Sequence, residues 1–189
     1  MALIPNRISN QQLELRRWSL DELDSLLGAI EVSFNELHTW MIWARTMPTR
    51  DQMHELVLED LRRFDNDERW QFFIFEFATG ELVGSAGLHR RGEPDELEIG
   101  YWVRSDRTGR GYATQAAGLL TAAAFDASAD IVRVKISMDA SNLASAAVPL
   151  KLGFIRQGEH ERDSVTPGHN GRGAMWTMER RDWTLVDRI

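Results

Sequence analysis

The sequence predicts a single domain, residues 1–189, with a mixed α/β fold: a central mixed sheet of about seven strands and about four helices. Three observations predict it. Apolar residues recur at helical spacing in several segments and alternate in shorter, strand-like segments. Between residues 70 and 103 the strand connections are so short that antiparallel hairpins result, whereas helices separate the later strands. No repeat, linker or low-complexity tract divides the 189 residues.

The N-terminal third predicts one strand and then two helices. Leucines alternate over 11–18 as in a half-buried strand, and apolar residues recur at helical spacing over 19–30. Two capping boxes mark the helix starts, Ser19 with Glu22 and Thr49 with Gln52. The second box begins a helix through residue 64, and the aromatic segment 33–48 has no clear period.

From residue 70 onward, strands dominate. Three successive strands are expected over 70–77, 82–90 and 96–103. A glycine-rich turn then opens a helix of roughly four turns, through about residue 127. The remaining elements are a strand, a short helix stopped by a glycine, and two final strands, over 131–138, 141–152, 154–161 and 174–180.

Composition excludes several classes of protein. Hydrophobic residues make up 43% of the chain, so a packed core is expected. A net charge of −7 argues against a nucleic-acid or membrane-surface role. The chain has no cysteine, and its five histidines show no metal-ligand spacing, so we expect no metal. Without a long apolar segment, the chain is expected to be soluble and cytoplasmic.

Glycine and positive charge lie together just before the helix that starts near residue 112. Gly109 and Gly111 flank Arg110, while Arg104 and Arg107 come shortly before them, and Asp106 is the only residue expected to offset these charges. A helix start presents unpaired N–H groups and partial positive charge, and glycines let a ligand approach the backbone. The turn therefore predicts a polyphosphate site, or else a solvated glycine loop. Walker A and dinucleotide-binding patterns do not match, since Thr114 stands where the latter needs glycine.

The surroundings of this turn resemble a known family. The stretch EIGYWVRSDRTGRGYATQA, followed by DASNLASAAVPLKLGF, is similar to the GNAT superfamily of N-acetyltransferases. Within it, the chain most resembles the ribosomal-protein serine and alanine N-acetyltransferase branch, the RimJ/RimL-like enzymes. The resemblance runs from about Leu13 to Trp183. One departure is Thr108, where the family's pyrophosphate loop usually has glutamine or arginine; Arg107 beside it can compensate.

The resemblance implies a GNAT fold and acetyl-CoA as the cofactor. Strands 4 and 5 of the expected sheet then splay apart, and the pantetheine arm lies in the gap. The implied contacts with the cofactor come from three segments: Tyr101, Trp102 and Val103 beside the arm; Thr108, Gly109, Arg110, Gly111, Tyr112 and Ala113 at the pyrophosphate; and Asn142 with Ser145.

Ser145 and Glu98 are the catalytic residues that the resemblance suggests. Many family members protonate the leaving thiolate with a tyrosine at a position that is Pro149 here, so Ser145 takes this role by analogy. Alternatively, Ser145 bonds only to its own helix and Asn142 only caps it. Glu98 is the candidate base, with a solvated strand residue as the alternative. The branch's usual glutamate base falls on Ser164, so that assignment does not carry over.

The acceptor is expected to be a primary amine. Its pocket would draw on Phe34, His38, Trp40, Met41, Trp43 and His89, most of them core residues with one or two facing the cleft. Three functions remain open: N-terminal acetylation of a protein or peptide, which predicts an open cleft; acetylation of a small amine (antibiotic, amino acid or polyamine), which predicts a closed, acidic pocket; and acyl-CoA sensing without catalysis. The net charge favours cationic acceptors. A homodimer is expected by analogy alone.

Overall fold

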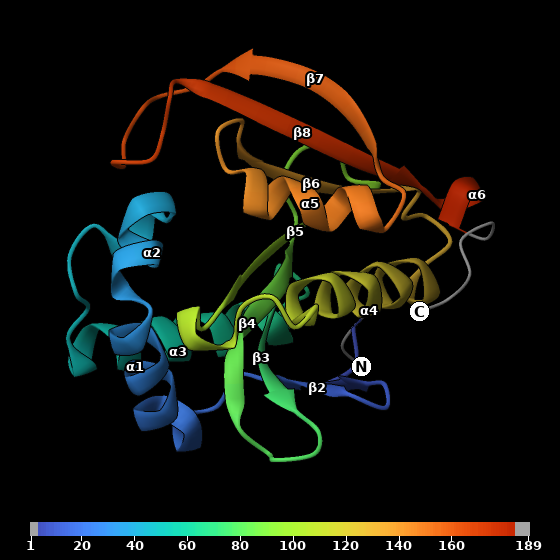
Figure 1. The fold of residues 1–189 in the computed structure, drawn as a ribbon. Coiled ribbons are helices and arrows are strands. Elements are labelled where there is room, and N and C mark those ends of the chain that lie inside the picture. Colours follow the sequence, from blue (N-terminus) through green and yellow to red (C-terminus); the bar gives the residue numbers. More distant parts are fainter. Residues whose placement is uncertain (1–3, 184–189) are drawn as a thin grey trace.

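The computed structural model describes residues 4–183. Within them, eight strands form one sheet, in the order β1-β2-β3-β4-β5-β6-β8-β7 (Figure 1). The strands are β1 (Arg7–Ser9), β2 (Leu13–Arg17), β3 (Arg69–Glu76), β4 (Leu82–His89), β5 (Glu96–Val103), β6 (Arg133–Asp139), β7 (Ile155–Glu161) and β8 (Arg172–Glu179). The helices are α1 (Leu23–Val32), α2 (Phe34–Trp40), α3 (Arg50–Asp65), α4 (Tyr112–Ala127), α5 (Leu143–Lys151) and α6 (Arg180–Trp183).

The predicted mixed α/β class is confirmed, with small differences in element number. The additional strand, β1, has three residues, too few to show periodicity, and it pairs antiparallel with β2. The second capping box is confirmed, because the Thr49 hydroxyl accepts from the Gln52 amide and the Gln52 side chain accepts from the Thr49 amide. The first predicted capping box, Ser19 with Glu22, is wrong. A 3₁₀ turn over Leu20–Glu22 comes before α1, which begins at Leu23, and the Ser19 side chain makes no capping hydrogen bond.

The sheet opens between β5 and β6. These parallel strands pair from Glu96 and Arg133 to Ile99 and Ile136 and then part. Beyond Ile99, β5 is bonded only to β4, through the pairing that ends with Gly84 and Val103. The expected splay is therefore present, between the fifth and sixth strands because β1 adds one to the count.

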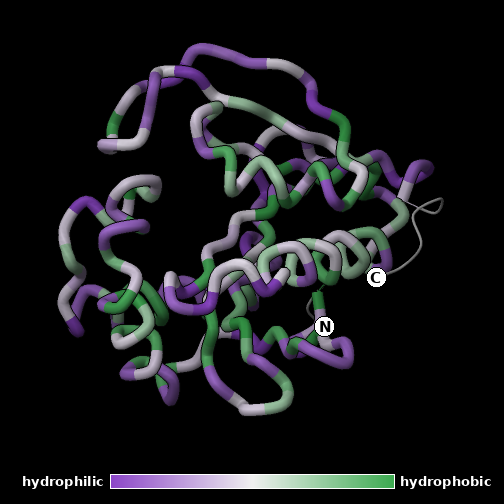
Figure 2. Tube along the Cα trace, in the orientation of Figure 1, coloured by the Kyte–Doolittle hydropathy of each residue, from purple (hydrophilic) through white to green (hydrophobic). Residues whose placement is uncertain are grey.

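Two hydrophobic clusters cover opposite faces of the sheet. One packs α4 and the strands' inner residues together with α5, and it includes Tyr101 and Val103 of β5 at its edge. The other packs α1, α2 and α3 against β3 and β4, and it includes Trp102. Alternate side chains of β5 thus serve different faces. In Figure 2 the central strands are largely hydrophobic, whereas the edge strand β7, exposed along its whole length, is largely hydrophilic.

None of the helices within residues 4–183 combines the length and the apolar character needed to cross a membrane.

Candidate functional site

A cavity of about 810 Å³ lies at the opening between β5 and β6. It is lined from both faces of the sheet, because β5 has no neighbour on this side after Ile99. Of the residues predicted from the sequence, it brings together Glu98, Tyr101, Trp102, Asn142 and Ser145. Val103 and residues 108–113 are not among its lining residues and lie at the end of β5 and the start of α4.

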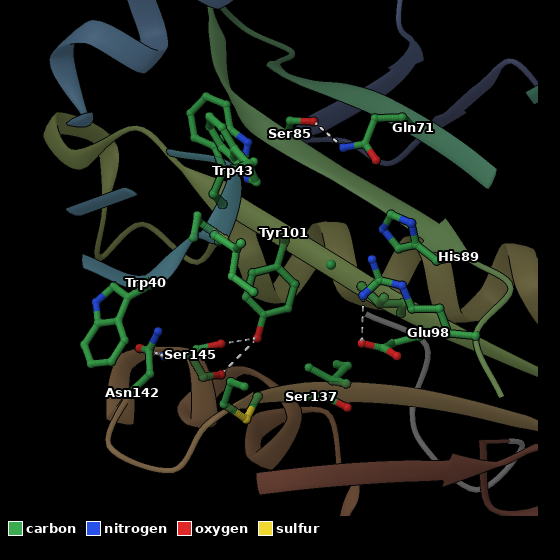
Figure 3. A pocket seen from close by; sticks show the side chains of 18 of the residues that line it. Trp40, Trp43, Gln71, Ser85, His89, Glu98, Tyr101, Ser137, Asn142 and Ser145 are labelled. Atoms are coloured by element: carbon green, nitrogen blue, oxygen red, sulfur yellow. Dashed lines mark hydrogen bonds and ion pairs between the residues drawn. The ribbon is translucent and has the colours of Figure 1, made fainter. Parts of the chain in front are cut away.

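Tyr101 and Ser145 meet across the opening (Figure 3). The Tyr101 hydroxyl donates to the Ser145 carbonyl oxygen at 2.9 Å and lies 3.2 Å from the Ser145 Oγ. Burial raises the pKa of Tyr101 to about 12, although the bond to Ser145 opposes the rise. The phenol is therefore neutral across the physiological range and available as a hydrogen-bond donor. The α5 helix has Pro149 where many family members have a tyrosine. Tyr101 of β5 thus places a phenol hydroxyl beside the first turn of this helix.

Asn142 orients the start of α5. Its side-chain oxygen accepts a hydrogen bond of 3.0 Å from the Ser145 amide, so it caps the helix. The cap holds Ser145 on the first turn, with its hydroxyl toward the cavity (Figure 3). Pro149 lies in the nine-residue α5, which is short as expected. Asn142 therefore has at least the capping role, and it also lines the cavity.

The glycine turn reaches α4 through two glycines in the left-handed conformation. Gly109 and Gly111 have φ of +75° and +81°, in the left-handed region, and Gly111 is the residue before α4. A Cβ on Gly109 would have no heavy atom within 4 Å, so open space lies beside this backbone. The first amides of α4 have no partner within the helix. The loop therefore leaves N–H groups and room for a phosphate group.

The arginines near the turn are mostly committed to carboxylates. Glu81 bonds the guanidinium groups of both Arg104 and Arg107, and Asp106 bonds Arg104 as well. The hydrogen bonds from Arg107 are the main cause of the lowered pKa of Glu81. The expectation that only Asp106 offsets the charge of these arginines is thus wrong, because Glu81, just before β4 and more than 20 residues away in sequence, pairs with both Arg104 and Arg107.

The side chains of Trp102 and Tyr112 pack into the two hydrophobic clusters on opposite faces of the sheet. Trp102 packs with the cluster under α1 to α3, and its ring lies 6.4 Å from that of Trp43. The Tyr112 ring is buried in the other cluster, and its hydroxyl donates to Glu76. Packing therefore holds both side chains in place, and contact of either residue with the cofactor stays a prediction.

The aromatic segment contributes more to the cavity than expected. The cavity is lined by Trp40, Met41 and Trp43 of this segment and by His89 of β4, but not by Phe34 or His38. None of the six is fully buried, so the expectation that most are core residues is wrong. The segment forms α2 and a 3₁₀ turn over Ile42–Ala44, and this irregular path at the sheet opening exposes the rings.

Glu98 and His89 face each other as cross-strand partners on β5 and β4 (Figure 3). Burial raises the pKa of Glu98 against the opposing influence of Arg91, Lys135 and Arg162. Burial also lowers the pKa of His89 to about 3, helped by nearby arginines. His89 is accordingly neutral and too weak a base to accept a proton near neutral pH, which leaves Glu98 as the stronger candidate.

The loop between β7 and β8, residues 162–171, contributes Arg162 and His169 to the cavity wall and is called the strap here. On one side, the Gly168 amide and the Thr166 hydroxyl both donate to the Thr39 carbonyl, at 3.0 and 2.8 Å. On the other side, the Ser141 hydroxyl donates to the Gly168 carbonyl at 2.9 Å. His169, also near α2, is buried and lines the cavity. Through these hydrogen bonds the strap links α2 to the residues before α5, and in Figure 1 the loop between β7 and β8 lies near α2.

Sequence reasoning missed the strap and the hydroxyl pair for different reasons. The strap lies between the two final predicted strands, and its contacts cannot be predicted from local patterns because they join residues more than 100 positions apart. Tyr101 was assigned to the cofactor arm, although its being one of only two tyrosines was a usable signal. Among residues 4–183, no group of three histidine, cysteine or acidic side chains is arranged to hold a metal ion.

Comparisons with known proteins identify the family. The model of the acetyltransferase (GNAT) domain matches residues 12–155. YdaF of Bacillus subtilis, provisionally named a ribosomal N-acetyltransferase, is 25% identical over 92% of this chain and 94% of its own.

Two solved structures share the fold. RimL, the ribosomal L7/L12 α-N-protein acetyltransferase, solved with coenzyme A, has a TM-score of 0.83 at 20% identity and covers 92% of this chain and 97% of its own. The microcin C7 self-immunity acetyltransferase MccE, solved with acetyl-CoA and AMP, has a TM-score of 0.83 at 19% identity. The match covers 94% of this chain and 98% of MccE. This chain belongs to the GNAT acetyltransferases, enzymes that take their acetyl group from acetyl-CoA.

Proposed function

We propose that this enzyme transfers the acetyl group to the N-terminal α-amino group of a protein or peptide. The observation that carries the proposal is the composition of the cavity wall. Three arginines, Arg69, Arg91 and Arg162, line it, against the two carboxylates of Glu98 and Asp139. Asp139 is occupied by hydrogen bonds from Ser141 and Asn170. Polyamines and aminoglycosides carry several positive charges and would need an acidic pocket instead.

The residues around the opening fit acetyl-CoA, which supplies an acetyl group activated as a thioester. The turn over 108–113 offers backbone N–H groups beside open space for the pyrophosphate. From there, the edge of β5 beyond Ile99 leads to the cavity, and its backbone is unpaired on the β6 side. This edge gives an extended pantetheine arm a strand to lie against, with Tyr101 and Ser145 at the cavity end.

The α-amine must be neutral before it attacks. An α-amino group has a pKa near 8, so a sizeable fraction is neutral at pH 7.5 without assistance. In the proposed site, Glu98 accepts the proton that the nitrogen loses as the new N–C bond forms. The raised pKa of Glu98 moves it toward the range in which a carboxylate is an effective base.

The breaking C–S bond leaves negative charge on sulfur, and the chain must stabilise it. Ser145 was the candidate donor, and the structure adds the Tyr101 hydroxyl 3.2 Å from its Oγ. In the proposed mechanism, the hydroxyl of Tyr101 or of Ser145 donates a hydrogen bond to the sulfur, and the other hydroxyl stays hydrogen-bonded to that donor. Because the Tyr101 pKa is about 12, the phenol stabilises the thiolate as a donor and does not lose its proton outright.

Acetylation of a small amine is the second candidate. The observation in its favour is the strap, which closes one side of the cavity through bonds to Thr39 and leaves no fully open groove. MccE, which shares the fold, was solved in complex with both acetyl-CoA and AMP, so this fold can hold a small molecule together with acetyl-CoA. The basic cavity wall then favours a small amine that also carries an anionic group.

Thiol release from acetyl-CoA, measured against a mixed panel of amines, tests the proposal. The panel contains peptides with Ser, Ala and Met N-termini, together with polyamines, aminoglycosides and amino acids. Turnover of peptides alone is the expected result. Turnover of one small amine and no peptide would replace it with the second candidate. Tight binding of coenzyme A in calorimetry without turnover of any amine would support a non-catalytic sensor of acyl-CoA.

A further inference from the structure

Arginines form a continuous border from the cavity to a second hollow. The second hollow, of about 390 Å³, lies where the end of α3 meets the β4–β5 turn. It shares Arg69, His89 and Arg91 with the main cavity. Arg63 and Arg90 continue its wall, together with Glu59 and Glu68. We call Arg63, Arg69, Arg90, Arg91 and Arg162 the arginine border.

The charges of this border are only partly balanced by neighbouring carboxylates. Arg69 lies 3.2 Å from the buried carboxylate of Asp60, and Arg63 is bonded to Glu59. Arg91, in contrast, is 65% exposed and approaches Glu98 only to 3.8 Å. Arg90 donates to the carbonyl oxygens of two turns. Arg91 and Arg90 are therefore well placed to exchange weak contacts for those of a bound anion.

Glu98 lies at the inner end of the border, and three cations act on it. Arg91 comes from the β4–β5 turn, Lys135 from β6 and Arg162 from the strap. Lys135 is held by the buried Glu96, which leaves the two arginines to face the cavity. The cavity wall near Glu98 thus carries guanidinium groups from two separate segments, the β4–β5 turn and the strap.

We propose that the acceptor carries carboxylates at its second to fourth residues, which bind Arg91, Arg162 and Arg90 while the amine lies beside Glu98. This inference rests on the proposed N-terminal acetylation and narrows its substrate class to acidic N-termini. Three extended residues reach about 10 Å, and the second hollow adjoins the cavity, because Arg69, His89 and Arg91 line both. The net charge of −7 misleads here, because the site is locally basic on an acidic molecule.

The test uses three peptides that differ only at residues two to four after an N-terminal serine: Glu-Asp-Glu, Gln-Asn-Gln and Lys-Arg-Lys. We expect kcat/KM for the acidic peptide to exceed that of the amide peptide about tenfold, chiefly through KM, with the basic peptide poorest. Raising ionic strength should shrink the preference, since part of the charge is exposed. Arg91→Glu should abolish or invert it. Arg50→Glu, on an exposed arginine that pairs with Asp24, should leave it intact.

Each outcome separates this inference from the function on which it rests. Equal kcat/KM for the three peptides would overturn the acidic preference and leave N-terminal acetylation standing. The fallback measurement is peptide binding in the presence of coenzyme A, followed by tryptophan fluorescence. Binding of the acidic peptide without any turnover would support the arginine border and overturn the proposed function. Failure of all three peptides to bind or react, with a small amine acetylated, would overturn both.

Discussion

At the scale of single residues, two hydroxyl groups carry the proposed chemistry at the sulfur. We expect Tyr101→Phe and Ser145→Ala each to lower kcat by about 10- to 100-fold, because each removes a hydrogen bond to a charged group. Their effects should not multiply in the double variant, since the hydroxyls lie 3.2 Å apart and act together. Rapid-mixing kinetics with a good acceptor measures this.

Affinity for coenzyme A serves as the control for the hydroxyl variants. It should change little, because neither hydroxyl lies at the glycine turn. A full loss of activity in Tyr101→Phe with normal turnover in Ser145→Ala would make the phenol the sole donor. Normal turnover in both single variants and in the double variant would remove the pair from the mechanism.

At the scale of elements, the turn before α4 depends on backbone geometry. Gly111→Val should weaken coenzyme A binding about tenfold or more, because a side chain would block approach to the first amides of α4 and strain a φ of +81°. The left-handed strain alone costs about 1–2 kcal/mol. Calorimetric titration with coenzyme A measures the loss.

Gly80→Val provides a matched control for that strain. Gly80 also has a positive φ, +68°, and open space around its Cβ position, but it lies in the β3–β4 turn. The control should lose similar stability and keep its affinity for coenzyme A. Equal affinity in both variants would remove the turn from the cofactor site.

The strap is the second element whose contacts predict a measurable effect. A Cβ on Gly168 would come within 2.8 Å of the Thr39 carbonyl oxygen, so Gly168→Ala should detach the strap from α2. We expect KM for the acceptor to change severalfold while coenzyme A affinity stays constant, because the strap borders the acceptor side only. Steady-state kinetics with each substrate varied in turn separates the two.

Gly171→Ala is the corresponding control within the strap. It strains a φ of +80° but meets nothing closer than 3.8 Å, so the contact with Thr39 survives. If Gly168→Ala and Gly171→Ala change acceptor KM equally, the contact with α2 is irrelevant and general loosening of the loop explains the effect.

At the scale of the whole molecule, His89 couples folding to pH. The unfolded histidine binds a proton below about pH 6.5, whereas the folded protein resists protonation until about pH 3. The free energy of unfolding is therefore not reduced by protonation of this histidine above about pH 6.5. Below that pH, the free energy of unfolding falls by about 1.4 kcal/mol for each pH unit as the pH drops toward 3.

We expect His89→Gln to flatten this part of the pH dependence of the unfolding free energy. Urea unfolding at several pH values between 7 and 4 provides the measurement. His54→Gln, on the exposed side of α3, should keep the slope of the parent protein. If His89→Gln and the parent lose stability in parallel with falling pH, the folded protein accepts the proton at an ordinary pKa.

The sequence alone determined the class of fold, the glycine turn and most element positions. Helical and strand periodicities are local, and so is the second capping box at Thr49 and Gln52, which needs only neighbours three residues apart. The splay of the sheet came from the family resemblance, whose motifs report element order. The sequence did not predict the three-residue strand β1 or the 3₁₀ turn before α1, because neither is long enough to show a periodic pattern.

Only the tertiary structure decided which charges and hydroxyls meet. Glu81 neutralises Arg104 and Arg107 across more than 20 residues, and Tyr101 meets Ser145 across 44. The strap reaches Thr39 from 127 residues away. Such contacts depend on how elements pack and not on local patterning, and net charge says nothing of where charges gather. A chain with a net charge of −7 could therefore place a border of arginines along its cavity and the second hollow.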